Sequence, residues 1–218
     1  DAATGLPEHP VRMSFNVFSL DHAHFPSHDI LRSTIAACSA EAKQEREKEF
    51  FANASKVIGA DRIAVLEIAD RSTTGLVGPP DEEETPFHSL VKASGVTAKD
   101  TVDSGGSFGI GKNASFAVSD LQTVFYATTY KNGESEAFAA QGKVKLVSHT
   151  DPDGKKQRAT GYWGDPEGFR AVTDRALVPE WMTRTEIGTS IFCMGFRAAD
   201  DWAERMTYSL GSHFFGAV

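Results

Sequence analysis

The sequence has few cysteines and no long apolar run, and these absences argue against a disulfide-rich, metal-binding or membrane-spanning protein. Cys38 and Cys193 are the two cysteines in 218 residues, and their wide separation fits no metal-ligand or disulfide spacing. No stretch of 18 apolar residues occurs, which argues against a transmembrane helix. The first residues, Asp1 to Gly5, lack the basic and apolar regions of a signal peptide. We therefore expect a cytoplasmic protein with reduced thiols and no membrane partner.

Basic residues are also scarce. The chain has 22 Lys and Arg against 30 Asp and Glu, a formal net charge of −8. A general nucleic-acid surface needs clustered Lys and Arg, so this composition argues against one within these residues. A nucleotide pocket stays compatible with it, because backbone amides can hold phosphates whatever the net charge.

The length suits one domain covering residues 1–218, which we expect to be the N-terminal part of a longer protein. The missing initiator Met indicates a fragment or a processed chain. Alternating or continuous apolar residues predict strands, and 3.6-residue periodicity predicts helices. The expected strands are 11–20, 63–68, 121–130, 142–149, 157–163 and 189–196, and the expected helical segments are 29–57, 87–93, 113–119 and 200–215. This order predicts an α+β fold, a two-layer sandwich of helices on a mixed, largely antiparallel sheet.

An acidic residue ends the predicted strand 63–68. Asp70 is followed by Arg-Ser-Thr and then by Thr74 and Gly75, where the chain can turn away. A carboxylate held at a strand end can accept a hydrogen bond from an exocyclic amine, such as N6 of adenine. Taken alone, the pattern fits equally well an Asp that caps the following turn.

A glycine-rich segment precedes the predicted helix 113–119. It reads Gly105-Gly-Ser-Phe-Gly-Ile-Gly-Lys-Asn113, and its glycines let backbone N–H groups approach phosphates closely. The spacing from Gly106 to Lys112 matches a P-loop, but Asn113 stands where that loop needs Ser or Thr. The residues before it are polar rather than a buried strand, so we reject the P-loop interpretation. A plain turn is the structural alternative.

A Gly-Thr pair, Gly188-Thr189, lies just before the last predicted strand. The threonine can support a ligand, cap a turn or pair in a sheet. The pair carries little information by itself.

Together and in this order, the three segments resemble the GHKL superfamily of ATPases, which includes gyrase, Hsp90, histidine kinases and MutL. That family has an Asp box, a glycine-rich lid and a late Gly-Thr on a Bergerat-type fold. Its first box, a helical Glu-x-x-x-Asn, is matched by Glu49 to Asn53. The spacing leaves a second placement open, on the earlier part of the helical segment near Ser33 and Ala37. The stretch 104–130 is similar to bacterial ATPases of the MORC-like branch.

The resemblance implies an ATP-binding domain that uses Mg²⁺. It implies that Asn53 binds the metal ion and that Asp70 binds adenine. It also implies that Glu49 positions the water molecule for slow hydrolysis. It also implies a wider set of nucleotide contacts, which are Thr74, Gly75, Gly106, Ser107, Phe108, Gly109, Ile110, Gly111, Lys112, Asn113 and Thr189.

The same resemblance implies lid closure and homodimerisation of a full-length protein. Some relatives accompany restriction or phage-defence systems, and nucleic acid would be contacted through domains outside this sequence. The alternative is a non-hydrolysing nucleotide-binding or interaction module, a pseudo-ATPase that keeps the fold.

Overall fold

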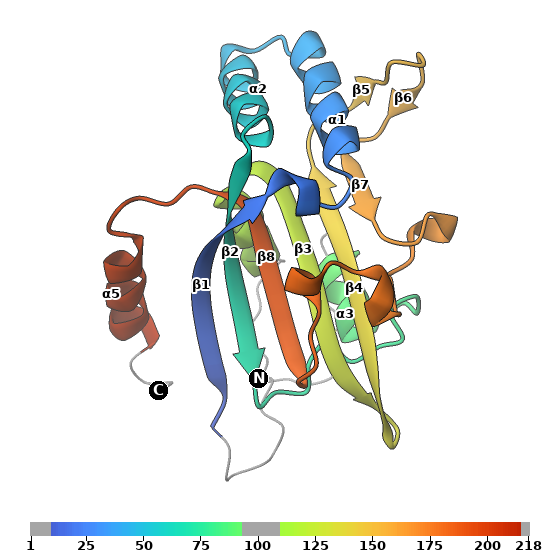
Figure 1. The fold of residues 1–218 in the computed structure, drawn as a ribbon, viewed down its shortest axis with the longest axis vertical. Coiled ribbons are helices and arrows are strands. Elements are labelled where there is room, and N and C mark those ends of the chain that lie inside the picture. The colour runs from blue at the N-terminus through green and yellow to red at the C-terminus, as the bar shows by residue number, and fades with distance from the viewer. Residues whose placement is uncertain (1–9, 93–109, 215–218) are drawn as a thin grey trace.

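The computed structural model describes residues 10–92 and 110–214, and these form the predicted α+β fold (Figure 1). The strands are β1 (Arg12–Asp21), β2 (Arg62–Arg71), β3 (Ser119–Asn132), β4 (Ser135–Lys145), β5 (His149–Thr150), β6 (Lys156–Gln157), β7 (Thr160–Trp163) and β8 (Gly188–Phe196). The α-helices are α1 (His28–Glu41), α2 (Glu45–Ile58), α3 (Pro86–Val91), α4 (Ile110–Ala117) and α5 (Trp202–Phe214). Short 3₁₀ turns cover His22–His24, Glu167–Phe169, Arg175–Leu177 and Glu180–Met182.

Six strands form the main sheet in the order β1-β2-β8-β3-β4-β7, and β5 and β6 form a separate small hairpin. Every pairing in the main sheet is antiparallel, so the sheet that was predicted to be mixed and largely antiparallel is antiparallel throughout. The strand expected at 142–149 instead begins at Ser135, directly after the turn at Asn132 and Gly133. Asn-Gly is a strong two-residue hairpin signal, and it makes β3 and β4 one long hairpin.

The apolar side chains of the sheet alternate between two core clusters. Along β3, Phe125 and Ala127 belong to the first cluster, while Val124 and Tyr126 belong to the second. The first cluster contains the buried residues of α1 and α2, and the second contains Phe87 of α3 and Phe116 of α4. Since neighbouring residues of a strand point to opposite faces, these helix pairs pack on opposite faces of the sheet.

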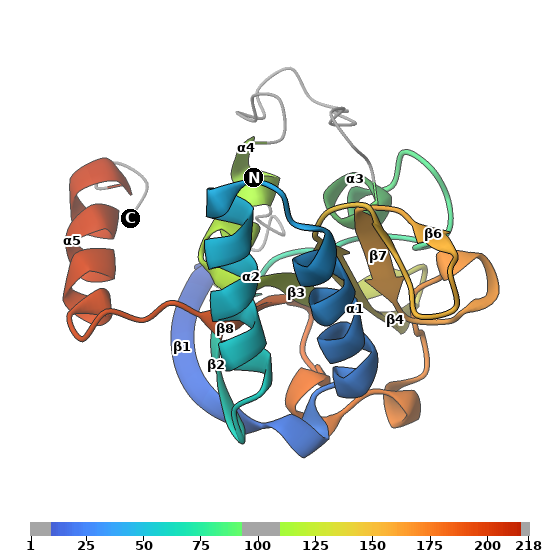
Figure 2. The same cartoon turned by 90° about the horizontal axis from the view of Figure 1, so that it is seen from above.

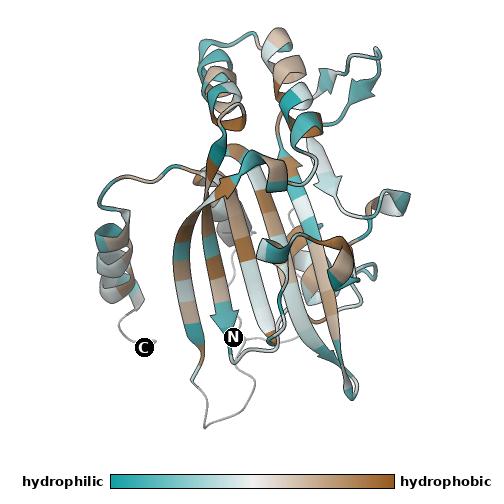
Figure 3. Cartoon of the chain, viewed as in Figure 1, coloured by the Kyte–Doolittle hydropathy of each residue, from teal (hydrophilic) through white to brown (hydrophobic). Residues whose placement is uncertain are grey.

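The helices α1 and α2 pack together above one end of the sheet, as Figures 1 and 2 show. Their buried residues are spaced for one helical face each and are Leu31, Ile35, Cys38, Phe51, Ala54 and Ile58. A capping box between Gln44 and Glu47 starts α2. Figure 3 shows that hydrophobic residues are concentrated on the strands, whereas hydrophilic residues cover much of α2 and the β5–β6 hairpin.

The last helix, α5, lies beyond β1 on the outer side of the sheet in both views (Figures 1 and 2). Its half-buried residues Trp202, Met206 and Leu210 recur every four residues, and Tyr208 is 77% exposed. The ring of Trp202 meets Phe196 at the end of β8 with a centroid distance of 6.1 Å. Within the described part of the chain, no helix combines the length and apolarity needed to span a bilayer.

Both cysteines are buried thiols without a disulfide. Burial raises the pKa of Cys193 to about 12 and also raises the pKa of Cys38. Because the thiolate is the reactive species, we expect neither thiol to react with Ellman's reagent at pH 8 in the folded protein. Both should react after unfolding in guanidinium. Rapid labelling of the native protein would contradict this burial.

Candidate functional site

The carboxylate of Asp70 is held at the end of β2 by two donors. The backbone N–H of Thr189 and the hydroxyl of Thr73 each donate a hydrogen bond to Asp70 Oδ1, both at 2.7 Å. Thr73 and Thr189 are buried, while Asp70 is half-buried. The other oxygen, Oδ2, accepts no hydrogen bond from the described residues. The Asp and Gly-Thr segments are therefore brought together across 119 positions of sequence, with one carboxylate oxygen left to accept from outside.

Two glycines let the backbone pass close to this carboxylate. Gly188 has φ +138°, and a Cβ there would lie 2.6 Å from Asp70 Oδ1. Gly75 has φ +68°, and its Cβ would meet the carbonyl oxygen of Thr129 and lie 2.9 Å from Thr128 Oγ1. Any side chain at either position would clash with polar backbone or site atoms, so both positions require glycine.

Thr128 of β3 ties the loop after Gly75 to the start of β8. Its buried hydroxyl accepts the Leu76 N–H at 2.8 Å and donates to the Gly188 carbonyl at 2.9 Å. Thr74, predicted as a nucleotide contact, is exposed and donates its hydroxyl to the Gly75 carbonyl at 3.2 Å. The loop that follows Asp70 is thus anchored to two strands rather than only to its own turn.

Sequence reasoning missed a buried cation beside Asp70. The guanidinium of Arg184 donates to the Asp70 carbonyl, to Ser190 Oγ at 2.9 Å and to the Glu186 carbonyl at 2.9 Å. Burial lowers the pKa of Arg184, and the nearby Asp70 carboxylate opposes that shift. Arg184 stands in no recognisable motif, so tertiary structure alone reveals it.

The glycine-rich segment leads into α4, which packs against β3 and β8 through Phe116 in the second core cluster. Strand alternation places Asp70 on this same face of the sheet, because Ile63 and Val65 of β2 point to the first cluster. Asn113 is exposed, and its Oδ1 accepts a hydrogen bond from Lys145 Nζ at 2.6 Å. The predicted contacts that the structure does not describe are Gly106, Ser107, Phe108 and Gly109, and those whose side chains it does not describe are Ile110, Gly111 and Lys112.

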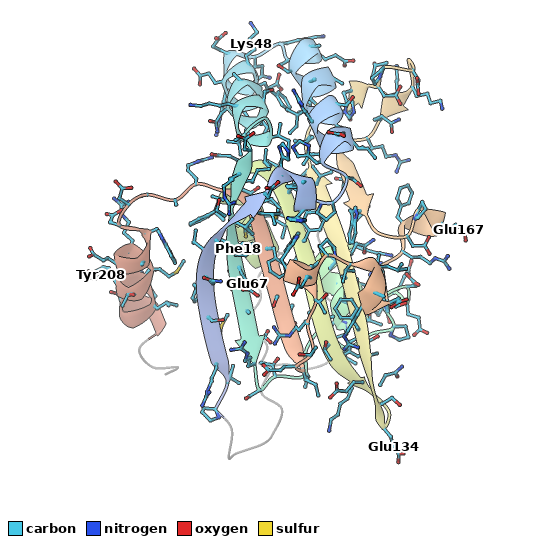
Figure 4. All side chains as sticks on the ribbon, in the orientation of Figure 1. Phe18, Lys48, Glu67, Glu134, Glu167 and Tyr208 are labelled. Atoms are coloured by element: carbon cyan, nitrogen blue, oxygen red, sulfur yellow. The ribbon has the colours of Figure 1, made fainter. Side chains whose placement is uncertain are left out.

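The structure does not bring Glu49 and Asn53 to Asp70. Both are exposed on α2, and Figure 4 labels their neighbour Lys48 at the end of the molecule opposite the tip of β2. The eight steps from Arg62 to Asp70 alone span about 26 Å.

A nucleotide pocket beside α1 and α2, which the Glu-x-x-x-Asn box implies through the resemblance, therefore has no support among the described residues. The apolar stripes of α1 and α2 pack into the first core cluster, on the face that Asp70 does not share. The alternative placement of the box does not lie near Asp70 either, because Ser33 and Ala37 are on α1, whose buried residues also belong to the first core cluster.

Two of the cavities that the described residues form bear on the choice of site. The larger, about 880 Å³, lies between α1 and the strands β4 and β7. Ser33 of the alternative box lines it, but none of the predicted nucleotide contacts does. Its lining includes Phe125 and Trp163 and three aspartates, of which Asp151 already accepts hydrogen bonds from backbone N–H groups of its own hairpin. The smaller, about 330 Å³, is lined partly by Arg71 and Glu186, next to the strand ends that hold Asp70. We place the candidate site at Asp70 because polar groups converge there.

No protein-family model matches the chain, and no curated protein matches it. The functional argument therefore depends on the geometry around Asp70 and on the motifs themselves.

Proposed function

We propose that this domain binds an adenine nucleotide and that Asp70 recognises the base. The observation that carries the proposal is the state of its carboxylate. Oδ1 is oriented by Thr189 and Thr73, while Oδ2 has no hydrogen bond from the described residues. A half-buried acceptor fixed in this way suits the exocyclic amine of adenine, since orientation is settled before the ligand arrives.

The apolar neighbours of Asp70 support a purine at this position. Ile68 lies two residues earlier on the same face of β2, and Ile191 lies two residues beyond Thr189 on β8. Both are only half-buried by the described residues. Flat apolar surface beside one well-placed polar group is the usual composition of a small-molecule site.

The phosphate side of the proposal comes from the sequence. The glycine-rich residues 105–112 run into α4, which begins at Ile110 and packs on the same face as Asp70. Backbone N–H groups of glycines before a helix are suited to bind phosphates. Lys112 adds a positive charge to that segment.

Magnesium-dependent hydrolysis has less support. The described residues contain no group of three or more His, Cys, Asp or Glu side chains arranged to hold a metal ion. Asn53 and Glu49, which would supply the metal ligand and the catalytic acid, are exposed on α2, whereas Asp70 lies at the far end of β2. The residues present therefore do not fit the Mg²⁺ site that the resemblance implies. This observation favours the second candidate, a module that binds nucleotide without hydrolysing it.

Calorimetry with ATP and its non-hydrolysable imido analogue, paired with a phosphate-release assay, separates the two candidates. We expect both nucleotides to bind with similar affinity. We also expect Glu49→Ala and Asn53→Ala to leave affinity and phosphate release at wild-type values, because neither residue reaches the Asp70 site. Loss of a measurable release rate in Glu49→Ala would restore the catalytic assignment of that box.

The wider predictions rest on the resemblance alone. They are lid closure, homodimerisation of a longer protein, contact with nucleic acid through other domains and a place in restriction or phage defence. The Asp70 site neither requires them nor depends on them. The expected cytoplasmic location rests instead on the lack of signal-peptide features in the first residues and on the two unpaired cysteines.

A further inference from the structure

Strand β1 is a long edge of the main sheet. It pairs with β2 over ten residues, and among the described residues its outer side has no strand partner. The opposite edge, β7, has only four residues. Short edge strands are one way in which proteins avoid pairing with other chains, and β1 does not use it.

The other features that keep an edge strand from pairing with another chain, namely charged residues, proline and bulges, are also missing from most of β1. From Met13 to Leu20 it has no charged residue and no proline, and its register with β2 runs without a bulge. Met13 is 60% exposed, and Ser14 and Asn16 are exposed too. Such a strand presents unpaired N–H and C=O groups together with apolar side chains, which is a template for another strand.

We propose that β1 pairs antiparallel with β1 of a second copy of this chain, which extends the sheet across a two-fold axis. An axis perpendicular to the sheet keeps each side chain on its face. Residues that lie opposite each other must then differ by an even number of positions. Among these registers, the one with Phe15 opposite Phe15 of the second copy also places Met13 opposite Val17. That face is then apolar against apolar, while Ser14 meets Asn16 on the other face.

The position of α5 supports a second copy as the occupant. This helix lies on the β1 side of the sheet in both views (Figures 1 and 2). Its half-buried residues Trp202, Met206 and Leu210 form an apolar stripe. Tyr208, labelled in Figure 4, is on its outer side. A strand added to β1 comes next to α5, whose apolar stripe adds to the area that the strand pair buries. The inference does not depend on nucleotide binding.

The first test uses charge at the two exposed positions, with the molecular mass measured by light scattering without nucleotide. We expect the wild-type chain to be a dimer at micromolar concentration. Ser14→Lys/Asn16→Lys should be a monomer with an unchanged circular dichroism spectrum, because like charges then face each other. Ser14→Glu/Asn16→Lys should restore the dimer, since opposite charges meet in this register and Glu67 of β2 lies beside position 16.

A second test reads the register directly. Phe15→Cys should form a disulfide-linked dimer on mild oxidation, because opposite Cα atoms in an antiparallel pair lie within bridging distance. Ser19→Cys should not, because its two copies are far apart in this register, and the native cysteines are buried. A wild-type chain that stays monomeric, a dimer insensitive to the double lysine variant, or equal cross-linking at both positions would overturn the proposal.

Discussion

Asp70→Asn should weaken ATP binding by tenfold or more, with the domain still folded. The amide oxygen of the asparagine can still accept from Thr189 and Thr73, so the loop keeps its anchor. Its NH₂ group then replaces Oδ2, and a donor faces the donor N6 of adenine. Loss of one charge-assisted hydrogen bond is worth roughly 1.5–3 kcal/mol, which is at least a factor of ten in affinity. Calorimetric titration with ATP measures the change.

Replacing the adenine base of the nucleotide tests more directly whether Asp70 recognises it. Inosine triphosphate carries an oxygen in place of the exocyclic amine, so the wild-type carboxylate should disfavour it and the asparagine variant should favour it. The ratio of the two affinities should therefore shift toward inosine in Asp70→Asn. The matched control is Asp153→Asn, an exposed residue of the β5–β6 turn, which should leave both affinities unchanged. An unaltered ratio in Asp70→Asn would show that this carboxylate does not recognise the base.

Gly75→Ala should destabilise the domain by about 3 kcal/mol or more. Its φ of +68° costs an alanine about 1–2 kcal/mol by itself. The added methyl group would also clash with the Thr129 carbonyl and Thr128 Oγ1. Those atoms belong to the central strand β3, so they cannot move without disturbing its pairing with β8. Urea denaturation followed by circular dichroism measures the loss.

Gly133→Ala is a control with nearly the same backbone strain. Gly133 has φ +64° at the β3–β4 turn, near Glu134, which Figure 4 labels, and nothing lies within 4 Å of its added Cβ. We expect this variant to lose only the cost of the left-handed conformation, about 1–2 kcal/mol. Equal destabilisation of the two variants would mean that the loop after Asp70 is free to move away from β3.

Local pattern was enough to predict most of the elements. The strand predicted at residues 11–20 and the helical segment predicted at residues 29–57 appear in the structure as β1, α1 and α2, and the α+β class is confirmed. The prediction failed at Asn132 and Gly133, where a hairpin turn was overlooked and β4 was placed late. It also overestimated the mixed character of the sheet, because strand direction depends on how distant segments pair and not on local periodicity.

The sequence by itself determined which residues could carry chemistry here. Asp70, Gly75 and Thr189 stand out as types and spacings, and their carboxylate, absent side chain and backbone N–H are local properties. Tertiary structure alone decided how they combine. Antiparallel pairing of β2 with β8 sets Thr189 against Asp70, and it brings in Arg184, which no motif marks. Side-chain alternation then separates Glu49 and Asn53 from the site, because the apolar stripe of their helix packs on the other face of the sheet.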